Sequence, residues 1–401
     1  MWDARNPVAR HLGKEIMTLS EIFRLERLLG CWIHARLPNG AAKTAHFGSA
    51  RQSNDLLRSI RTARRARLGR CVPRGTCYRG NAVKYIGGFF ELELPRARGG
   101  WHPNAIALST GRACMAGILQ HVRPRTVHMP FYTCDALIAP VLEAGIGLEF
   151  YHLDKQLRPA RLRSPKRGEL LIAVNYFGLQ TAVIRKFAER FGDRLVADNT
   201  QAFFERPASG HWAFCSARKF FGVPDGAYLY AAKRLDLHPP PNPASDIRHL
   251  VNRLVGRQQT GYRQVRRFEQ KTDGRIRQMS VLTERLLSAI DYAEARRRRR
   301  ENYLLLHRKL AKHNLFNAAL PTDATPFCYP FLLDRPVDRW LLARHRLYVP
   351  TLWEDVFQRQ RPGFAWERKF AMQLLPLPID HRYRVEDMED ALQRFQKVVK
   401  L

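Results

Sequence analysis

One lysine stands in a stretch of the sequence whose neighbours predict buried strands. Lys219 lies between apolar, strand-like runs at residues 212–215 and 227–231, where a solvated lysine is not expected. Ser216 precedes it closely, and two glycines follow it closely, so the backbone can turn tightly around whatever the amine holds. The pattern favours an amine held in a pocket over the commoner alternative, an edge lysine whose charged tip reaches the solvent.

A carboxylate is predicted to face the same pocket. Asp198 directly follows the strand-like residues 194–197. In an open α/β sheet, a side chain at the carboxyl end of a buried strand points into the crevice where ligands bind. We therefore expect Asp198 and Lys219 to lie close together, although an aspartate after a strand can also be a helix cap or a turn residue.

This pair of groups suits pyridoxal phosphate. The cofactor needs an amine that forms a Schiff base with its aldehyde and a carboxylate that keeps its pyridine nitrogen protonated. Its phosphate needs a cradle, which Thr110, Gly111 and Arg112 can provide because they open a predicted helix whose first amides are free. The order of phosphate loop, aspartate and lysine along the chain makes this prediction stronger than any one of the motifs.

The elements that position these residues are predicted from the alternation of strand and helix patterns after residue 85. The predicted strands are residues 105–109, 126–129, 147–152, 169–175, 194–198, 212–215 and 227–230, and the predicted helices are residues 111–122, 134–144 and 182–191. Such alternation predicts an α/β fold, with a mostly parallel sheet flanked by helices. A proline-rich linker ends this part near residue 245, and one long helical pattern over residues 276–314 follows it.

Three regions are therefore predicted. Residues 1–84 form a basic N-terminal extension, residues 85–245 a large cofactor-binding α/β domain, and residues 246–401 a helical segment with a small α+β domain. The extension is interpreted as a disordered tail, or as sequence upstream of a natural start near residues 83–85, because it has few aromatic residues for base stacking. The alternative is an arm that binds nucleic acid.

The composition is that of a globular protein with an unusual charge. The 401 residues carry a formal net charge of +32, which a biased source composition explains as well as an anionic partner does. Five consecutive arginines, residues 296–300, are interpreted as a solvated helix end and not as a nucleic-acid patch. The 7 cysteines form no CxxC pair, which favours reduced thiols in the cytoplasm over disulfides or zinc. No membrane span and no signal peptide are predicted.

Residues 85–401 resemble the fold-type I pyridoxal-phosphate-dependent transferases, closest to the DegT/DnrJ/StrS sugar aminotransferases. The segments that carry the resemblance are residues 109–113, 129–134, 174–178, 198–202, 216–219 and 375–380. The resemblance implies that Lys219 forms the Schiff base and that Asp198 partners the pyridine nitrogen. It also implies a set of further cofactor-binding residues, namely Thr110, Gly111, Arg112, Tyr132, Cys134, Asn175, Gln201 and Ser216. Gln201 would lie near the phenolic oxygen of the cofactor, and Ser216 near its phosphate.

The sequence departs from that group in three places. Cys134 stands where an aromatic residue commonly stacks on the cofactor ring, so Tyr132 or Phe131 is expected to stack instead. Phe214 replaces a serine five residues before the lysine. Residues 276–279 replace a segment that reaches the cofactor of the neighbouring subunit, which leaves Arg275 or Arg277 to bind that phosphate.

The resemblance implies an aminotransferase that works as a homodimer. It would move an amino group from an amino acid, glutamate or glutamine, to a keto sugar that is linked to a nucleotide. The product would serve polysaccharide or secondary-metabolite biosynthesis. Two alternatives remain open, a pyridoxal-phosphate enzyme of another reaction type such as an amino-acid lyase, and a non-catalytic nucleic-acid-binding or regulatory protein with the same fold. Retention of Lys219 argues against the sugar dehydratases that carry histidine at this position.

Overall fold

The computed structural model describes residues 34–36, 42–44, 92–95, 98–242 and 246–401. The chain divides into two compact units, Met1–Phe90 and Glu91–Leu401. In the first unit, β1 (His34–Arg36) pairs with β2 (Ala42–Thr44) in an antiparallel hairpin. The predicted basic extension otherwise lies outside the described residues.

The second unit is built on an eight-stranded sheet in the order β3-β10-β9-β8-β7-β4-β5-β6. Its strands are β3 (Ile106–Leu108), β4 (Thr126–Pro130), β5 (Gly147–Leu153), β6 (Pro159–Ala160), β7 (Glu169–Val174), β8 (Leu195–Asp198), β9 (Trp212–Ser216) and β10 (Ala227–Tyr230). The five central strands β5, β4, β7, β8 and β9 run parallel, whereas β3, β10 and β6 pair antiparallel at the edges. The predicted, mostly parallel sheet is confirmed.

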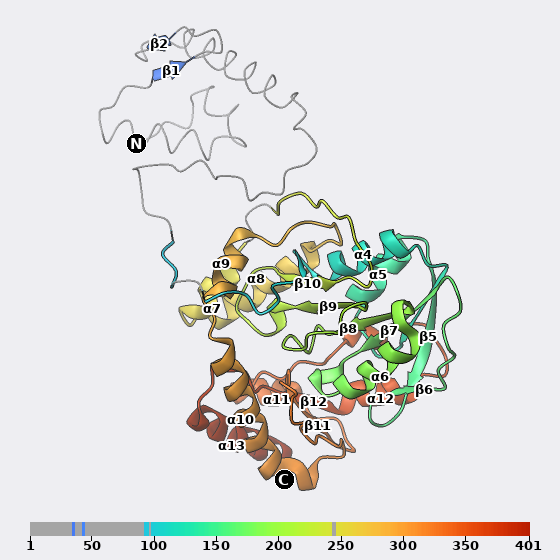
Figure 1. Ribbon diagram of the computed structural model, residues 1–401. Coiled ribbons are helices and arrows are strands. Elements are labelled where there is room, and N and C mark those ends of the chain that lie inside the picture. The colour runs from blue at the N-terminus through green and yellow to red at the C-terminus, as the bar shows by residue number, and fades with distance from the viewer. Residues whose placement is uncertain (1–33, 37–41, 45–91, 96–97, 243–245) are drawn as a thin grey trace, which may run out of the picture. The chain divides into compact units, whose positions relative to one another are not determined.

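Helices cover both faces of this sheet. Helices α4 (Gly111–Val122) and α5 (Asp135–Glu143) lie on one side, and α6 (Thr181–Phe191) lies on the other (Figure 1). Helix α4 begins where the sequence predicts because the hydroxyl of Thr110 accepts a hydrogen bond from the Ala113 amide, at 3.0 Å. It ends at Arg123, whose left-handed backbone donates its amide to the carbonyl of Leu119.

The rest of the chain adds helices and a two-stranded sheet. Beyond β10 follow α7 (Arg248–Leu254), α8 (Gln258–Lys271), α9 (Val281–Ser288), α10 (Tyr292–Leu310), β11 (Tyr329–Leu332), α11 (Arg339–Arg344), α12 (Ala365–Gln373), β12 (Leu374–Leu377) and α13 (Val385–Val399). The single long helix predicted over residues 276–314 is wrong. Ser280 and Asp291 each cap a helix start with a side-chain oxygen, so two helices form where one was predicted.

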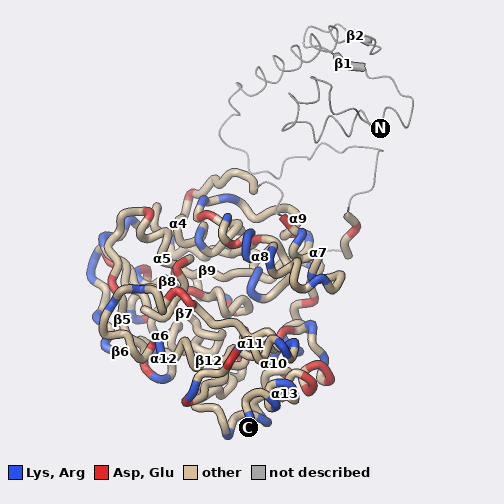
Figure 2. Tube along the Cα trace, turned by 180° about the vertical axis from the view of Figure 1, so that it is seen from behind, with Lys and Arg blue, Asp and Glu red and all other residues tan. Residues whose placement is uncertain are grey.

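The positive charge is distributed over many elements. Seen from behind, blue Lys and Arg segments lie along α7, α8 and α10, and red Asp and Glu segments accompany them on α10 and α13 (Figure 2). On α10 itself, Arg297 pairs with Glu294 and Glu301, and Arg298 pairs with Glu294. Arg299 of the same run is only 1% exposed, so the interpretation of the whole run as a solvated helix end is wrong.

Candidate functional site

Two neighbouring parallel strands bring Asp198 and Lys219 to the same edge of the sheet. Asp198 is the last residue of β8 and lies opposite Phe214 of β9. Strand β9 ends at Ser216, and the short 3₁₀ turn η3 (Ala217–Lys219) follows it directly. Because β8 and β9 run in the same direction, both residues reach the carboxyl edge.

The electrostatics of Asp198 show that the lysine is close. Its carboxyl is 5% exposed and accepts a hydrogen bond from the Thr200 amide at 2.8 Å. Burial raises the pKa of this carboxyl above its ordinary value, and the positive charge of Lys219 opposes that rise. The two residues lie at the same edge of the sheet, and their roles in binding a cofactor stay a prediction.

Two thiols also lie near the amine. Burial raises the pKa values of Cys134 and Cys328, and in both cases the charge of Lys219 acts in the opposite direction. In the described part of the chain, no side chain forms a hydrogen bond or an ion pair with the lysine amine. Lys219 as a whole residue is half-buried.

The start of α4 adjoins this pair. A Cβ built on Gly111 would lie 3.6 Å from Cγ2 of Thr200, so the first turn of the helix borders the loop that follows Asp198. The first turn contains no acidic residue, which leaves the positive end of the helix dipole uncompensated by its own side chains. The Thr110 hydroxyl, however, is already engaged as the helix cap.

The basic residues near the helix start face α8. Nη1 of Arg112 donates to the carbonyl of Thr272 at 2.6 Å. The guanidinium of Arg218 lies 5.0 Å from the ring centroid of Phe268 and 3.6 Å from a carboxylate oxygen of Glu269. Arg218 was not among the predicted site residues, and its place directly before the lysine was the signal for it.

Asn175 and Gln201 are fully buried and shape the loops at the same edge. Nδ2 of Asn175 donates to Oγ1 of Thr181 at 2.9 Å, and its Oδ1 accepts from the Gln180 amide, so this side chain fixes the turn after β7. Oε1 of Gln201 accepts from the Phe177 amide at 2.7 Å. Nε2 of Gln201 is buried and has no partner among the described residues.

The loop after β7 holds a backbone that is unfavourable for most residues. Phe177 has φ of 58° and Gly178 has φ of 74°. A Cβ on Gly178 would lie 2.9 Å from the carbonyl oxygen of Gln201 and 3.0 Å from that of Thr325. Only glycine permits this close approach of three backbone segments.

The aromatic residues expected to stack on a ring are enclosed by other rings. Tyr132 is 0% exposed and lies 4.6 Å from the ring centroid of Trp353 and 5.3 Å from that of Phe370. Phe131 stacks on Phe364 at 4.2 Å. Cys134, half-buried at the start of α5, is the residue of this motif on which the charge of Lys219 acts. A stacking role for Tyr132 stays a prediction.

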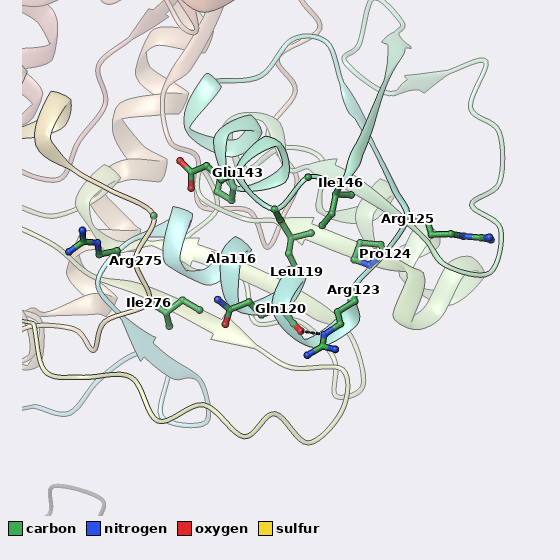
Figure 3. A pocket seen from close by; sticks show the side chains of 14 residues that line it. Ala116, Leu119, Gln120, Arg123, Pro124, Arg125, Glu143, Ile146, Arg275 and Ile276 are labelled. Carbon is green, nitrogen blue, oxygen red and sulfur yellow. Dashed lines mark hydrogen bonds between the residues drawn. The ribbon is translucent and has the colours of Figure 1, made fainter. Parts of the chain in front are cut away.

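A large hollow lies elsewhere on the molecule. It measures about 690 Å³ and is bordered by the carboxyl ends of α4 and α5 and by residues 274–276 (Figure 3). Its side chains include Gln120, Arg123 and Glu143, and also Arg275, which the sequence offered as a contact for the cofactor phosphate of the neighbouring subunit. The guanidinium of Arg123 donates to the carbonyl of Gln120 at its own helix end, at 3.3 Å.

Comparison with known proteins gives structural matches without sequence matches. No protein-family model matches the sequence, and none of the curated proteins compared with it does either. A DegT/DnrJ/EryC1/StrS aminotransferase from Brucella abortus matches with a TM-score of 0.52 and 16% identity, over 73% of this chain and 85% of the other. The sugar aminotransferase CalS13 from Micromonospora echinospora gives 0.50 and 17%, over 74% and 87%. NtdA from Bacillus subtilis, solved with its cofactor PMP bound, gives 0.53 and 14%, over 74% and 73%.

Two further observations concern the described residues alone. No helix among them is both long and apolar enough to cross a bilayer. No cluster of three or more histidine, cysteine and acidic side chains in the described ranges has an arrangement that could hold a metal ion. The matched structures and the sheet order agree with the expectation from the sequence, and the chain has the fold of the fold-type I aminotransferases.

Proposed function

We propose that this protein is a pyridoxal-phosphate-dependent aminotransferase. The observation that carries the proposal is that a buried carboxylate and an amine with no partner among the described residues lie at the carboxyl edge of β8 and β9. The start of α4 lies beside them, where a phosphate can bind to free amides. The likeness in fold to proteins named as aminotransferases supports this proposal.

The residues present fit the cofactor. Lys219 offers an amine without a competing partner among the described residues, and Asp198 offers a carboxylate already removed from water. The buried Nε2 of Gln201 lacks an acceptor, a situation that costs roughly 1–3 kcal/mol until a partner is found. A phenolic oxygen of a bound cofactor would supply that acceptor. The half-buried Ser216 and the first amides of α4 would hold the phosphate.

The proposed mechanism assigns one task to each residue. When bound, pyridoxal phosphate supplies an aldehyde carbon that bonds to an amino group and a protonated ring that withdraws electrons from it. Nζ of Lys219 would hold the cofactor by its aldehyde carbon and, as a free amine, would take up and return the proton of the amino-bearing carbon. Asp198 keeps the ring nitrogen protonated through its negative charge. The rings around Tyr132 and the buried loop after β7 exclude water from this edge.

For the substrates, we propose glutamate or glutamine as donor and a nucleotide-linked keto sugar as acceptor. The support is the resemblance of the motifs, together with the name of CalS13 as a sugar aminotransferase. The basic composition would favour an acceptor that carries a diphosphate. We further propose a cytoplasmic homodimer in which residues 85–245 form the cofactor domain, residues 246–401 the smaller part, and residues 1–84 an extension.

An absorbance spectrum tests the proposal. Purified protein with added pyridoxal phosphate should show a band at about 410–430 nm, the region expected for this cofactor bonded to a lysine. The band should be absent in Lys219→Ala and should move to shorter wavelength when glutamate is added. Wild-type protein that shows no band would contradict the proposal.

The same experiment separates the reaction types. A band that ignores every amino donor would leave the cofactor in place and remove the aminotransferase activity. Where glutamate does move the band, product analysis with unlabelled and ¹⁵N-labelled glutamate distinguishes transfer of the nitrogen from release of ammonia by a lyase.

A further inference from the structure

The buried Arg299 connects two regions of the molecule at the proposed site. Its guanidinium is 1% exposed. Nη2 donates to the carbonyl of Phe220, the residue directly after Lys219, at 3.3 Å. Nη1 donates to the carbonyls of Pro326 and Phe327, at 3.3 and 3.1 Å. One side chain of α10 thus spans the lysine turn and residues 326–327.

The contacts of Arg299 are made to neutral groups. Its guanidinium carbon lies 4.5 Å from the ring centroid of Phe220, in a cation–π contact. Among the described residues it forms no ion pair, and the nearby Asp380 is paired with Arg382 instead. Burial lowers the pKa of Arg299 to about 10, so the guanidinium is still charged at neutral pH. Burying a charge without a carboxylate is costly, so these carbonyl bonds are what hold it there.

On the far side of the turn that carries the lysine, the rings of Phe220 and Phe221 pack against Phe203 and Phe204, but hydrogen bonds to groups outside the turn are few. Before the lysine, the Ala217 amide donates to the carbonyl of Gly226, which ties the turn to β10. After it, the amides of Phe220 and Phe221 both donate back to the carbonyl of Ala217, within the turn itself. A single 3₁₀ turn has weak hydrogen-bond geometry and is not rigid alone. Besides these ring contacts, the side chain of Arg299 supplies a directed hydrogen bond from outside the turn to its second half.

The bridge continues to the loop that follows Asp198. The amide of Phe327 donates to the carbonyl of Phe177 at 2.8 Å, and the amide of Phe177 donates to Oε1 of Gln201 at 2.7 Å. A continuous hydrogen-bonded path therefore links the turn after β9 with the loop after β8 through a side chain of α10. The path ends at Phe220, the residue directly after Lys219, and at Gln201, in the loop that follows Asp198.

We propose that Arg299 is a positioning residue, which fixes the turn carrying Lys219 so that the amine stays in reach of its target after the bond to the cofactor has opened. This inference rests on the proposed function. During turnover the lysine is released and must act from a fixed place, and small displacements of a reacting group are expensive in rate. A bridge from α10 holds that place without touching the substrate.

Its neighbour Arg300 provides a matched control. Nη1 of Arg300 binds the carbonyls of Pro321 and Ala324 in the same segment, from the next position of the same helix. None of its hydrogen bonds reaches the lysine turn. Arg299→Met and Arg300→Met therefore both loosen residues 321–327, but only the first removes the link to Phe220.

The test compares these two variants with the wild type. In Arg299→Met we expect kcat to fall by about tenfold or more, with KM for the amino donor within about threefold, because positioning and not binding is lost. The induced circular dichroism of the cofactor band should fall to about half or less, since a less fixed lysine holds the cofactor less rigidly. Arg300→Met should keep both values. Equal values of kcat and circular dichroism in the two variants would overturn the proposal.

A measurement on the cofactor-free wild type does not depend on folding of a variant or on activity. Hydrogen exchange of the Phe220 and Phe221 amides should be as slow as that of the β9 amides, because the turn is fixed without a ligand. Exchange as fast as in an exposed turn would overturn the inference. A wild type that shows this protection but no cofactor band would refute the proposed function and leave the bridge standing.

Discussion

The two ends of α4 differ in what surrounds them. The first turn borders the loop that follows the buried carboxylate of Asp198, whose pKa responds to the charge of Lys219. The last turn opens on a hollow of about 690 Å³ whose polar groups are mostly exposed and bonded to nearby carbonyls. This hollow thus lies at the end of the helix that is away from the proposed cofactor-binding groups. Buried polar groups without a full set of partners locate the proposed site better than volume does.

Replacing Lys219, near the first turn of the helix, should have the largest effect on turnover. In Lys219→Gln we expect turnover to fall by at least about 10⁴-fold, because the group that holds the cofactor and moves the proton is lost. The measurement is steady-state transamination with glutamate. Lys233→Gln is the control, since Lys233 is exposed and paired with Asp193. Retained turnover in Lys219→Gln would show that the amine does no chemistry.

Removing the carboxylate should have the next largest effect, with opposite signs for activity and stability. In Asp198→Asn, turnover should fall by about 10²–10³-fold because the charge that protonates the ring is lost. The cofactor-free variant should nevertheless be more stable than the wild type at neutral pH, because burial penalises the ionised Asp198.

The sign of the pH dependence follows from the raised pKa of Asp198. The folded protein keeps the proton to a higher pH than the unfolded chain does, so the wild type loses stability as pH rises through the folded pKa. The stability gap to Asp198→Asn should therefore be smallest in acid, below the unfolded value of about 3.9, and widen on the way to neutral pH. Urea unfolding of both cofactor-free proteins across this range checks it. A gap that does not depend on pH would contradict the assignment.

The third largest effect is expected from a change at Gly178, where the backbone conformation requires glycine. Gly178→Ala places a Cβ within 3.0 Å of two carbonyl oxygens at a φ of 74°, so we expect a loss of about 3 kcal/mol in the free energy of unfolding. Gly145→Ala is the matched control at the other end of the comparison. It has a φ of 66° and nothing within 4 Å, so it should cost only about 1 kcal/mol. Equal losses in denaturant unfolding would mean that the loop after β7 is not tightly packed.

The smallest effect is expected at the hollow. Gln120 is exposed and lines it, so Gln120→Ala should change the free energy of unfolding by less than about 0.5 kcal/mol. Turnover should stay within about twofold. A tenfold change in turnover or in KM would assign the hollow a part in the reaction and reverse the comparison between the two ends of α4.

Much of the sheet and its helices could be predicted from local patterns. Residues 111–122 form a helix as predicted, because the cap at Thr110 and the apolar spacing act within a few residues of each other. Strand β8 and its terminal Asp198 follow from a short buried run, for the same reason. The positions of Thr110 and Asp198, which depend only on where these elements begin and end, could therefore be predicted from the sequence.

The remainder depends on packing between distant segments. The arginine run looks uniform in sequence, and only the course of residues 321–327 distinguishes the buried Arg299 from the exposed Arg297. Cys328, the residue directly before β11 of the smaller sheet, lies near enough to Lys219 for the lysine charge to act on its pKa, and no sequence motif indicates this. The break between α9 and α10 also escaped prediction, because the apolar spacing continues across it.

The position of β3 in the sheet has a consequence for synthesis on the ribosome. This strand precedes all the others of its sheet, yet its sole strand neighbour there is β10, the last of them. The amide of Gly226, which donates to the carbonyl of Ser109 at 2.7 Å, also emerges late. A nascent chain that stops short of Tyr230 therefore leaves an unpaired strand edge open to wrong partners. A chain truncated between β3 and the end of β10 should thus aggregate instead of forming a smaller folded unit.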